Sequence, residues 1–284
     1  MSKIKIAELF YSIQGEGRYM GVPSVFLRTF GCNFKCQGFG MPRGELSAEA
    51  DELGSIAHMF NKYEELPLVS TGCDSYASWH PDFKDLSPML ESNAIVHRIM
   101  EILPHRRWED EHLVITGGEP LLGWQRAYPE LLSHPSMNRL KEITFETNGT
   151  QKLSSEFKDY LVQWQMPDLE FAREITFSVS AKLPCSGEKW EEAINPEVVC
   201  EYEQVGTTYL KFVIATEQDF EDAKRATEEY RAAGFTGHVY LMPVGGVESV
   251  YALNNKNVAL LAMKNGLRYS DRLQVPLFKN EWGT

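Results

Sequence analysis

The chain has 284 residues, of which 43% are hydrophobic and 12% aromatic, enough for a packed core, so disorder as the main state is excluded. Forty acidic residues against 28 basic ones give a net charge of −12, which opposes binding to a nucleic-acid backbone or an anionic membrane. We find neither an apolar run of membrane-spanning length nor a signal-peptide pattern. Five cysteines, an odd number in a chain too large to need disulfide bonds, indicate a reducing compartment, and we expect a cytoplasmic protein.

Short β-branched or aromatic runs alternate with amphipathic stretches of helical length, which is typical of a parallel α/β sheet. The expected core strands span residues 24–30, 112–116, 142–146, 174–180, 207–214, 238–242 and 270–275. The expected helices span residues 94–103, 153–165, 218–233 and 249–265. We therefore predict an α/β fold of one domain over residues 1–284, with parallel strands that curl into a partial TIM-like barrel and helices outside.

The least periodic part of the chain runs from residue 37 to residue 72 and has an acidic, helix-like centre over residues 45–58. We interpret it as an insertion. Its roles as a lid, as a docking face for another protein, or as decoration without function all stay open.

Two cysteines, Cys32 and Cys36, stand four positions apart directly after the first expected core strand. Loops at the carboxyl ends of parallel strands are where active sites form. Two thiolates can hold two corners of a metal or iron–sulfur centre, with a third ligand from elsewhere. The alternative is a pair of buried free thiols that act as small hydrophobic side chains.

A second cluster, Gly117-Gly118-Glu119-Pro120, ends the next expected strand. Paired glycines allow a ligand to approach bare backbone, and a carboxylate can accept charge-assisted hydrogen bonds from an ammonium group. This strand end would suit the amino acid portion of a cofactor. A tight strand-to-helix turn is the alternative.

Polar residues near the N-terminus form a third candidate group. Gln14 and Glu16 lie in a glycine-flanked turn, and a carboxamide with a carboxylate offers both hydrogen-bond donors and acceptors. A plain hairpin turn would explain the same residues. Arg28 lies on the first core strand, and its planar guanidinium suits a carboxylate.

The two cysteines followed by the Gly-Gly-Glu-Pro strand end resemble the radical S-adenosylmethionine superfamily. More narrowly, five short blocks resemble the 7-carboxy-7-deazaguanine synthase family, at residues 10–17, 21–28, 73–75, 114–120 and 146–149. The resemblance implies a [4Fe–4S] cluster on three cysteines, with S-adenosylmethionine bound to the open iron. It also implies that electron transfer to the cluster yields methionine and a 5′-deoxyadenosyl radical.

One departure concerns the third cluster ligand. The superfamily pattern places a cysteine three positions after Cys36, where this chain has Phe39. Cys73, in Gly72-Cys73-Asp74-Ser75, resembles the missing segment, so the insertion would split the motif into C-x3-C-x36-C. Both ends of the insertion must then lie close in space. Gly72 stands where relatives have an aromatic residue over the cluster, and we expect Phe39 or Met41 to replace it.

The resemblance also implies roles for individual residues. Gly118, Glu119, Ser180 and Lys182 would bind S-adenosylmethionine, and Gly117 would join Gln14, Glu16 and Arg28 on the substrate side. Ser75 would be a Mg²⁺ ligand through its oxygen, although capping of the next turn would explain it equally well. A solvated lysine is the alternative for Lys182. Met242 stands where many relatives have a glutamine, which removes a hydrogen-bond donor. Cys185 and Cys200 lie in no ligand-like block and are interpreted as structural thiols.

The activity implied by the resemblance is a lyase reaction that contracts 6-carboxy-5,6,7,8-tetrahydropterin to 7-carboxy-7-deazaguanine with loss of ammonia, on the route to queuosine or another 7-deazaguanine. Implied partners are the pterin substrate, an electron donor such as a flavodoxin, and a second copy in a homodimer, with no nucleic acid and no membrane. Two alternatives stay open at this point. One is an activating enzyme for a glycyl-radical partner, and the other is a non-catalytic, three-thiolate metal-binding regulatory protein on the same fold.

Overall fold

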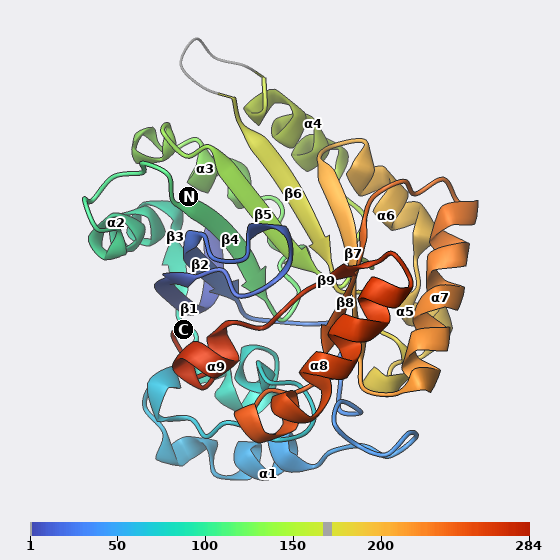
Figure 1. Ribbon diagram of the computed structural model, residues 1–284. Helices are drawn as coiled ribbons and strands as arrows, with labels where there is room; N and C mark the ends of the chain where they lie inside the picture. The colour runs from blue at the N-terminus through green and yellow to red at the C-terminus, as the bar shows by residue number, and fades with distance from the viewer. Residues whose placement is uncertain (1, 167–171) are drawn as a thin grey trace.

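The computed structural model describes residues 2–166 and 172–284. Within them one curved sheet has nine strands in the order β3-β1-β2-β4-β5-β6-β7-β8-β9 (Figure 1). β1 pairs antiparallel with both β2 and β3, and every pair from β2 to β9 is parallel. The strands are β1 Lys3–Ile13, β2 Pro23–Thr29, β3 Met89–Glu91, β4 His112–Gly117, β5 Glu142–Thr147, β6 Glu174–Val179, β7 Thr207–Ile214, β8 Val239–Pro243 and β9 Arg268–Tyr269.

Helices connect the parallel strands and cover the outer side of the sheet (Figure 1). The α-helices are α1 Glu49–Ser55, α2 Ser92–Ile102, α3 Tyr128–Leu132, α4 Ser155–Trp164, α5 Trp190–Ala193, α6 Pro196–Glu203, α7 Glu217–Ala232, α8 Glu248–Lys264 and α9 Gln274–Phe278. The 3-10 helices are η1 Gly17–Tyr19, η2 Ala57–Met59, η3 Tyr63–Glu65, η4 Tyr76–Ser78, η5 Pro81–Leu86, η6 Pro135–Met137 and η7 Pro184–Ser186. No helix of the described residues is long and apolar enough to span a membrane.

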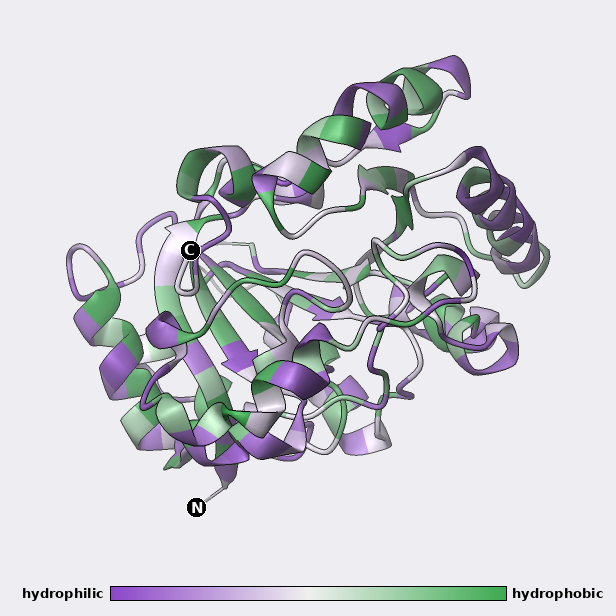
Figure 2. Cartoon of the chain, turned by 90° about the horizontal axis from the view of Figure 1, so that it is seen from below, coloured by the Kyte–Doolittle hydropathy of each residue, from purple (hydrophilic) through white to green (hydrophobic). Residues whose placement is uncertain are grey.

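The main core lies between the parallel strands and the outer helices. Phe145 and Phe177, from adjacent strands, stack with ring centroids 5.6 Å apart, and Phe177 stacks on Tyr202 of α6 at 4.6 Å. Because both faces of a parallel sheet are covered, such strands consist of nearly continuous apolar residues. Figure 2 shows mainly hydrophobic colours along the central strands and mixed colours on the surrounding helices, as expected for amphipathic helices over a core.

The predicted α/β fold with parallel strands and outer helices is confirmed. The first six expected core strands and all four expected core helices are present, with ends shifted by at most two residues. The expected strand over 270–275 is wrong. Its only ladder contact is the Ser270 N–H bond to the Leu241 carbonyl at 2.9 Å, after which the chain turns and enters α9.

The strands β1 and β3 were not predicted from the sequence. The alternating start of β1 is interrupted between Ile6 and Glu8, where its register with β2 shifts by one residue. A bulge of this kind breaks the two-residue period on which strand prediction depends.

A second, smaller core lies beside the sheet and includes the segment interpreted as an insertion. The helix expected over 45–58 is reduced to α1 followed by η2. Tyr63, Leu66 and Val69 of this segment pack with Tyr76 and Phe83. The neck of the segment is closed by a hydrogen bond of 2.7 Å from the Gly72 N–H to the Phe39 carbonyl, so its two ends lie together as the split motif requires.

Candidate active site

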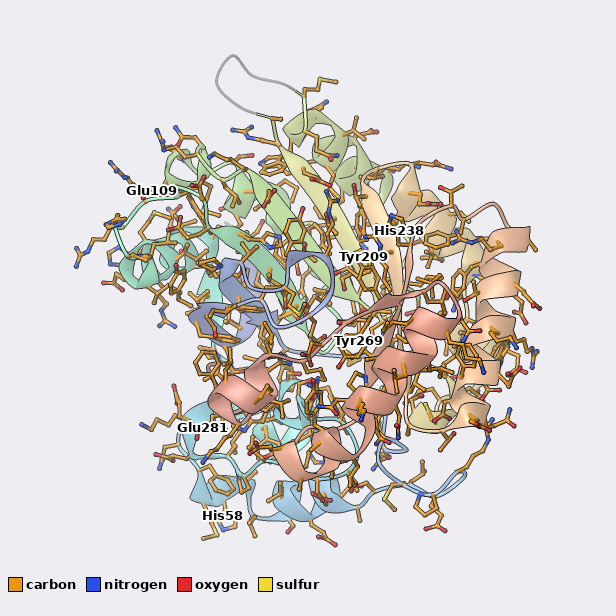
Figure 3. All side chains as sticks on the ribbon, in the orientation of Figure 1. His58, Glu109, Tyr209, His238, Tyr269 and Glu281 are labelled. Atoms are coloured by element: carbon orange, nitrogen blue, oxygen red, sulfur yellow. The ribbon has the colours of Figure 1, made fainter. Side chains whose placement is uncertain are left out.

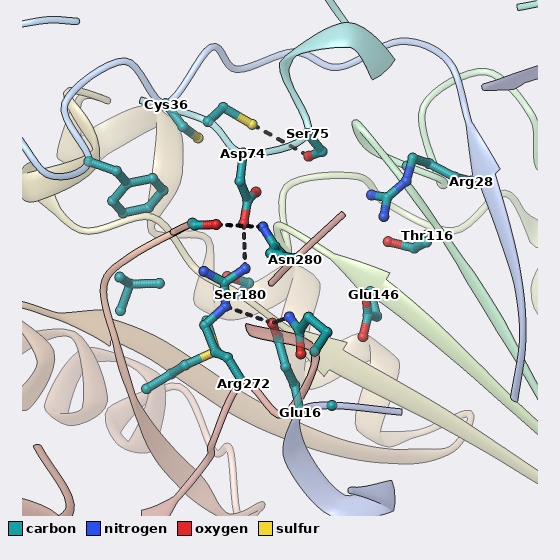
Figure 4. A pocket seen from close by; sticks show the side chains of 18 of the residues that line it. Glu16, Arg28, Cys36, Asp74, Ser75, Thr116, Glu146, Ser180, Arg272 and Asn280 are labelled. Carbon is teal, nitrogen blue, oxygen red and sulfur yellow. Dashed lines mark hydrogen bonds and ion pairs between the residues drawn. The ribbon is translucent and has the colours of Figure 1, made fainter. Parts of the chain in front are cut away.

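One cavity at the carboxyl ends of the strands collects the candidate residues (Figure 4). Its wall comes from β1 and β2, from the ends of β4 to β8, and from the two segments that carry cysteines. The C-terminal residues 280–284 also line it. The predicted residues on this wall are Gln14, Glu16, Arg28, Cys32, Cys36, Cys73, Ser75, Gly117, Gly118, Ser180 and Lys182. Glu119 is the one predicted site residue that does not line the cavity.

Three thiols face this cavity. Cys32 and Cys73 are half-buried and pack against the buried Cys36, together with Phe34 and Phe39. Burial raises the pKa of Cys32 to about 12 and raises the pKa of Cys36 and of Cys73 as well. A positive metal centre reverses such shifts because it binds the thiolate.

The thiols do not form a site for a single metal ion in the described part of the chain. Among the described residues, no group of three or more His, Cys, Asp or Glu side chains could hold one metal ion. An iron–sulfur cubane instead takes one thiolate at each of several irons. Cys185 and Cys200 line no part of the cavity. Their thiols face backbone carbonyls, of Val213 at 3.7 Å and of Ala233 at 3.5 Å respectively, as expected of structural residues.

The loop between the first two cysteines is held at both ends. The N–H groups of Lys35 and Cys36 both donate to the Glu188 carboxylate, at 2.9 and 2.7 Å. Cys36 itself has a φ of 52°, a left-handed conformation that non-glycine residues rarely adopt. At the other end, the Asn148 side-chain amide donates to the Asn33 side-chain oxygen at 2.9 Å. These contacts fix the directions in which the thiols point.

The glycine pair after β4 is required by close packing. A Cβ on Gly118 would lie 2.4 Å from the Gly31 carbonyl oxygen and 2.8 Å from the Cys32 Cβ. Gly117 has a φ of +153°, and a Cβ there would lie 2.4 Å from the Thr29 carbonyl oxygen. Only glycines permit this contact between the strand end and the cysteine loop.

The Glu119 carboxylate points away from the cavity into the protein. It accepts hydrogen bonds from the Thr147 hydroxyl at 2.8 Å and from the N–H groups of Leu121 at 3.0 Å and Asn148 at 2.6 Å. Burial raises its pKa to about 7. In this structure Glu119 therefore joins the ends of β4 and β5, and Gly117 and Gly118 are the residues of the motif that line the cavity.

The β6 end supplies Ser180 and Lys182. The Lys182 ammonium donates to the Ser180 hydroxyl at 2.9 Å and lies 5.9 Å from the centre of the Phe39 ring. The lysine is thus a half-buried part of the cavity wall rather than a solvated side chain. Phe39 lines the cavity and packs against the thiols, whereas Met41 does not line it. Of the two side chains expected near the cluster, the structure therefore brings only Phe39 to the thiols.

The Glu16 carboxylate is surrounded by donors. Lys211 forms an ion pair with one oxygen, and the other accepts from Arg272 Nε at 3.1 Å and from Gln274 Nε2 at 2.9 Å. Figure 4 shows Arg272 beside Glu16. Burial favours the neutral carboxyl, but Lys211 and Arg272 outweigh it and hold the pKa of Glu16 below its usual value. Glu16 is therefore a buried anion in this cavity.

Arg272 connects three segments of the site. Besides Glu16, it forms an ion pair with Asp74 and donates to the Gly245 carbonyl. Asp74 lies between Cys73 and Ser75, so the arginine connects the turn of Glu16 to the third cysteine. Ser75 precedes η4 but makes no side-chain capping bond, and its hydroxyl lies 3.5 Å from the Cys73 sulfur. The capping explanation for Ser75 is not what the structure shows.

The remaining predicted substrate residues pair with acids. Arg28 Nε donates to Glu8 at 2.8 Å, and the Gln14 amide donates to Glu146 at 3.1 Å. Burial raises the pKa of Glu8, although the adjacent Arg28 opposes this.

Sequence reasoning missed Glu8, Glu146, Lys211, Asp74 and Arg272 as parts of this site. Lys211 carried a usable signal, because a charged residue in the middle of a buried strand has to find a partner.

The C-terminal segment completes the wall. Trp282 packs edge-on against Tyr63 at 5.5 Å and Tyr76 at 5.6 Å, both of the second core. In Figure 3, Glu281 lies between α9 and the segment that carries His58. The second core thus holds residues 280–284 against the cavity.

The chain is similar to known proteins over nearly its whole length. No family model matches the chain. The 7-carboxy-7-deazaguanine synthase of Halobacterium salinarum is 27% identical, over 98% of this chain and 91% of its own length. That of Pyrobaculum aerophilum is 25% identical, over 99% and 97%. The crystal structure of QueE from Escherichia coli has a TM-score of 0.53 at 19% identity, covering 95% of this chain and 94% of that one.

The mostly parallel sheet with outer helices is thus the fold of the solved QueE structure, an α/β protein. The chain is thus similar, over almost its whole length, to proteins of the 7-carboxy-7-deazaguanine synthase family.

Proposed function

We propose that this protein is a radical S-adenosylmethionine lyase that converts 6-carboxy-5,6,7,8-tetrahydropterin to 7-carboxy-7-deazaguanine with loss of ammonia. The observation that carries the proposal is that one cavity is lined both by three thiols and by a polar set suited to a carboxylated pterin. Relatives that carry this activity in their names align with almost the whole chain. A glycyl-radical activating enzyme or a non-catalytic metal-binding protein is therefore disfavoured.

In this proposal Cys32, Cys36 and Cys73 hold the [4Fe–4S] cluster, and the bound cluster and S-adenosylmethionine supply the radical chemistry. The backbone at Gly118, which lines the cavity next to Cys32, approaches the cofactor. Ser180 and Lys182 complete this side of the cavity through their mutual hydrogen bond. Glu119 acts indirectly, because its carboxylate holds the end of β4 against Thr147 and Asn148.

The substrate occupies the opposite side of the cavity. Arg28 binds the carboxylate, and Gln14, Glu16 and the backbone of Gly117 bind the ring. Lys211 and Arg272 keep Glu16 ionised, so it accepts hydrogen bonds from ring N–H groups rather than donating one.

Further assignments follow from the same proposal. Ser75 contributes an oxygen ligand to Mg²⁺, with water and substrate completing the site, since its hydroxyl caps no turn and faces the cavity. An external one-electron donor such as a flavodoxin reduces the cluster. A homodimer accounts for Leu253 and Met263 of α8, which are 73% and 75% exposed.

The test is anaerobic incubation of the iron-reconstituted protein with S-adenosylmethionine, a reductant and the carboxylated tetrahydropterin, followed by mass analysis. We expect 7-carboxy-7-deazaguanine from the wild type and none from Cys36→Ala. Cys200→Ala is the matched control and should match the wild type. Formation of 5′-deoxyadenosine without any deazaguanine product would reject this substrate.

A further inference from the structure

We propose that Glu8 is a positioning residue that fixes the guanidinium of Arg28 so that its two terminal nitrogens face the substrate carboxylate. The inference rests on the proposed function, in which Arg28 binds that carboxylate. Glu8 itself touches Arg28 and acts through it.

The backbone is built to bring these two side chains together. β1 and β2 are antiparallel, and Glu8 lies directly opposite Arg28. Residues directly opposite in an antiparallel pair have their side chains on the same face. Earlier in β1, Ile6 pairs with Thr29 of β2. If the pairing continued from there without a shift, Ala7 would lie opposite Arg28. The one-residue shift between Ile6 and Glu8 is what puts a carboxylate there, as bulges near active sites commonly re-aim a side chain.

The contact is short and sheltered. Arg28 Nε donates to Glu8 Oε2 at 2.8 Å, with 7% of the Glu8 side chain and 19% of the Arg28 side chain exposed. The guanidinium carbon also lies 6.0 Å from the centre of the Phe10 ring, which stacks on Phe26 at 4.9 Å. The side chain of Arg28 is therefore held by an ion pair at Nε and by an aromatic ring.

The terminal nitrogens of Arg28 remain available. Within residues 2–166 and 172–284, Nε is the only atom of this guanidinium that donates a hydrogen bond. Figure 4 shows Arg28 beside Thr116 at the edge of the cavity. Two parallel N–H donors on a rigid plane match the two oxygens of a carboxylate. With Nε already engaged by Glu8, the end of the guanidinium is the edge that remains for this contact.

The experiment measures kcat and KM of the reconstituted enzyme, with product quantified, for the wild type, Glu8→Gln and Glu8→Asp. It also measures competitive inhibition by a pterin-6-carboxylate and by the same pterin without the carboxylate. Glu91→Gln is the matched control, because Glu91 is also at this end of the sheet but pairs with Lys3 at 3.6 Å with 45% of its side chain exposed. Unfolding midpoints are recorded for all variants.

We expect Glu8→Gln to raise KM about tenfold with kcat within about twofold, because binding rather than the chemical step is weakened. The preference for the carboxylated inhibitor should fall by about the same factor, and inhibition by the uncarboxylated pterin should not change. Glu8→Asp moves the carboxylate back by one methylene. It should also raise KM and lower the preference for the carboxylated inhibitor.

An unchanged KM, or equal weakening of both inhibitors, in a folded Glu8→Gln protein overturns the positioning role. If that variant does not fold, an unchanged KM in Glu8→Asp overturns it. Failure of the proposed function looks different, because the wild type would then neither turn over the carboxylated pterin nor prefer the carboxylated inhibitor.

Discussion

Replacing Lys211 with methionine tests the charge arrangement around Glu16. The pair is buried, with 5% of the Lys211 side chain and 14% of the Glu16 side chain exposed. Removing one partner of a buried ion pair costs about 3–5 kcal/mol when the remaining charge is left alone. Glu16 keeps Arg272 at 3.1 Å and Gln274 at 2.9 Å, so we expect a smaller loss, about 2–3 kcal/mol in the free energy of unfolding at pH 7.

The same variant should change how stability depends on pH. Although burial acts against ionisation, Lys211 and Arg272 hold the folded pKa of Glu16 below its usual 4.5. A depressed carboxyl pKa contributes stability that is present above the unfolded pKa and is lost as the pH falls towards the folded pKa. The difference between the wild type and Lys211→Met should therefore be largest at neutral pH and should narrow below about pH 4.5.

The measurement is urea unfolding of the wild type and Lys211→Met at several pH values, from neutral to below about pH 4.5. Lys224→Met is the control, because Lys224 pairs with Glu221 at 2.8 Å with 47% and 58% of the two side chains exposed. Exposed pairs contribute roughly 0–1 kcal/mol. The reasoning would be refuted if Lys211→Met lowered the free energy of unfolding no more than Lys224→Met does. It would also be refuted if the loss in Lys211→Met did not change with pH.

Three further predictions concern the thiols, a buried histidine and the insertion. Cys73→Ala should abolish reductive cleavage of S-adenosylmethionine and lower the bound iron, whereas Cys200→Ala should leave both near normal; the opposite result would identify the wrong third ligand. Burial lowers the pKa of His112 from 6.5 to about 3. The free energy of unfolding should therefore fall as the pH drops below 6.5, by about 3 kcal/mol at pH 4.5. In chemical unfolding, His112→Gln should make the stability less dependent on pH in this range. Replacing residues 42–67 with a Gly/Ser linker should leave a folded protein whose cluster absorbance bleaches faster in air; unchanged bleaching and turnover would exclude a protective role for the insertion.

The fold was predictable where burial dominates the sequence. The strands β4 to β8 are apolar runs because helices cover one face and the barrel interior the other, and such runs are visible without any structure. β1 was missed because its pattern breaks at the bulge before Glu8. The strand expected over 270–275 failed because Arg272 is directed into the site by Glu16 and Asp74, partners that are remote in sequence.

The site was predictable where chemistry needs a rare residue in a fixed place. Cysteines and paired glycines at strand ends pointed to the cavity wall, and the structure places Cys32, Cys36, Gly117 and Gly118 there. Partners across strands were not predictable in the same way. Whether Lys211 faces the cavity or the outer helices depends on sheet register, which a single sequence does not specify.

In the proposed site, Cys73 supplies the third thiolate from a segment far from Cys36 in the sequence. The entropic cost of loop closure grows slowly with loop length. The fold can therefore tolerate 36 residues between Cys36 and Cys73 if the end of the loop is held in place. The Gly72 N–H bond to the Phe39 carbonyl closes the neck of the loop, and the ion pair of Asp74 with Arg272 ties the thiol's neighbour to the far end of the chain.

Packing supplies a further anchor for the same thiol. Tyr76, three residues beyond Cys73, is fully buried in the second core, part of which the insertion itself provides. The segment of residues 37–72, which we interpret as an insertion, thus also contributes to the core that holds the neighbour of Cys73. The same core contacts Trp282 and so keeps the C-terminal segment against the cavity. In the proposed cluster site, the three thiolates need to be close together in the fold and do not need a fixed spacing in the sequence.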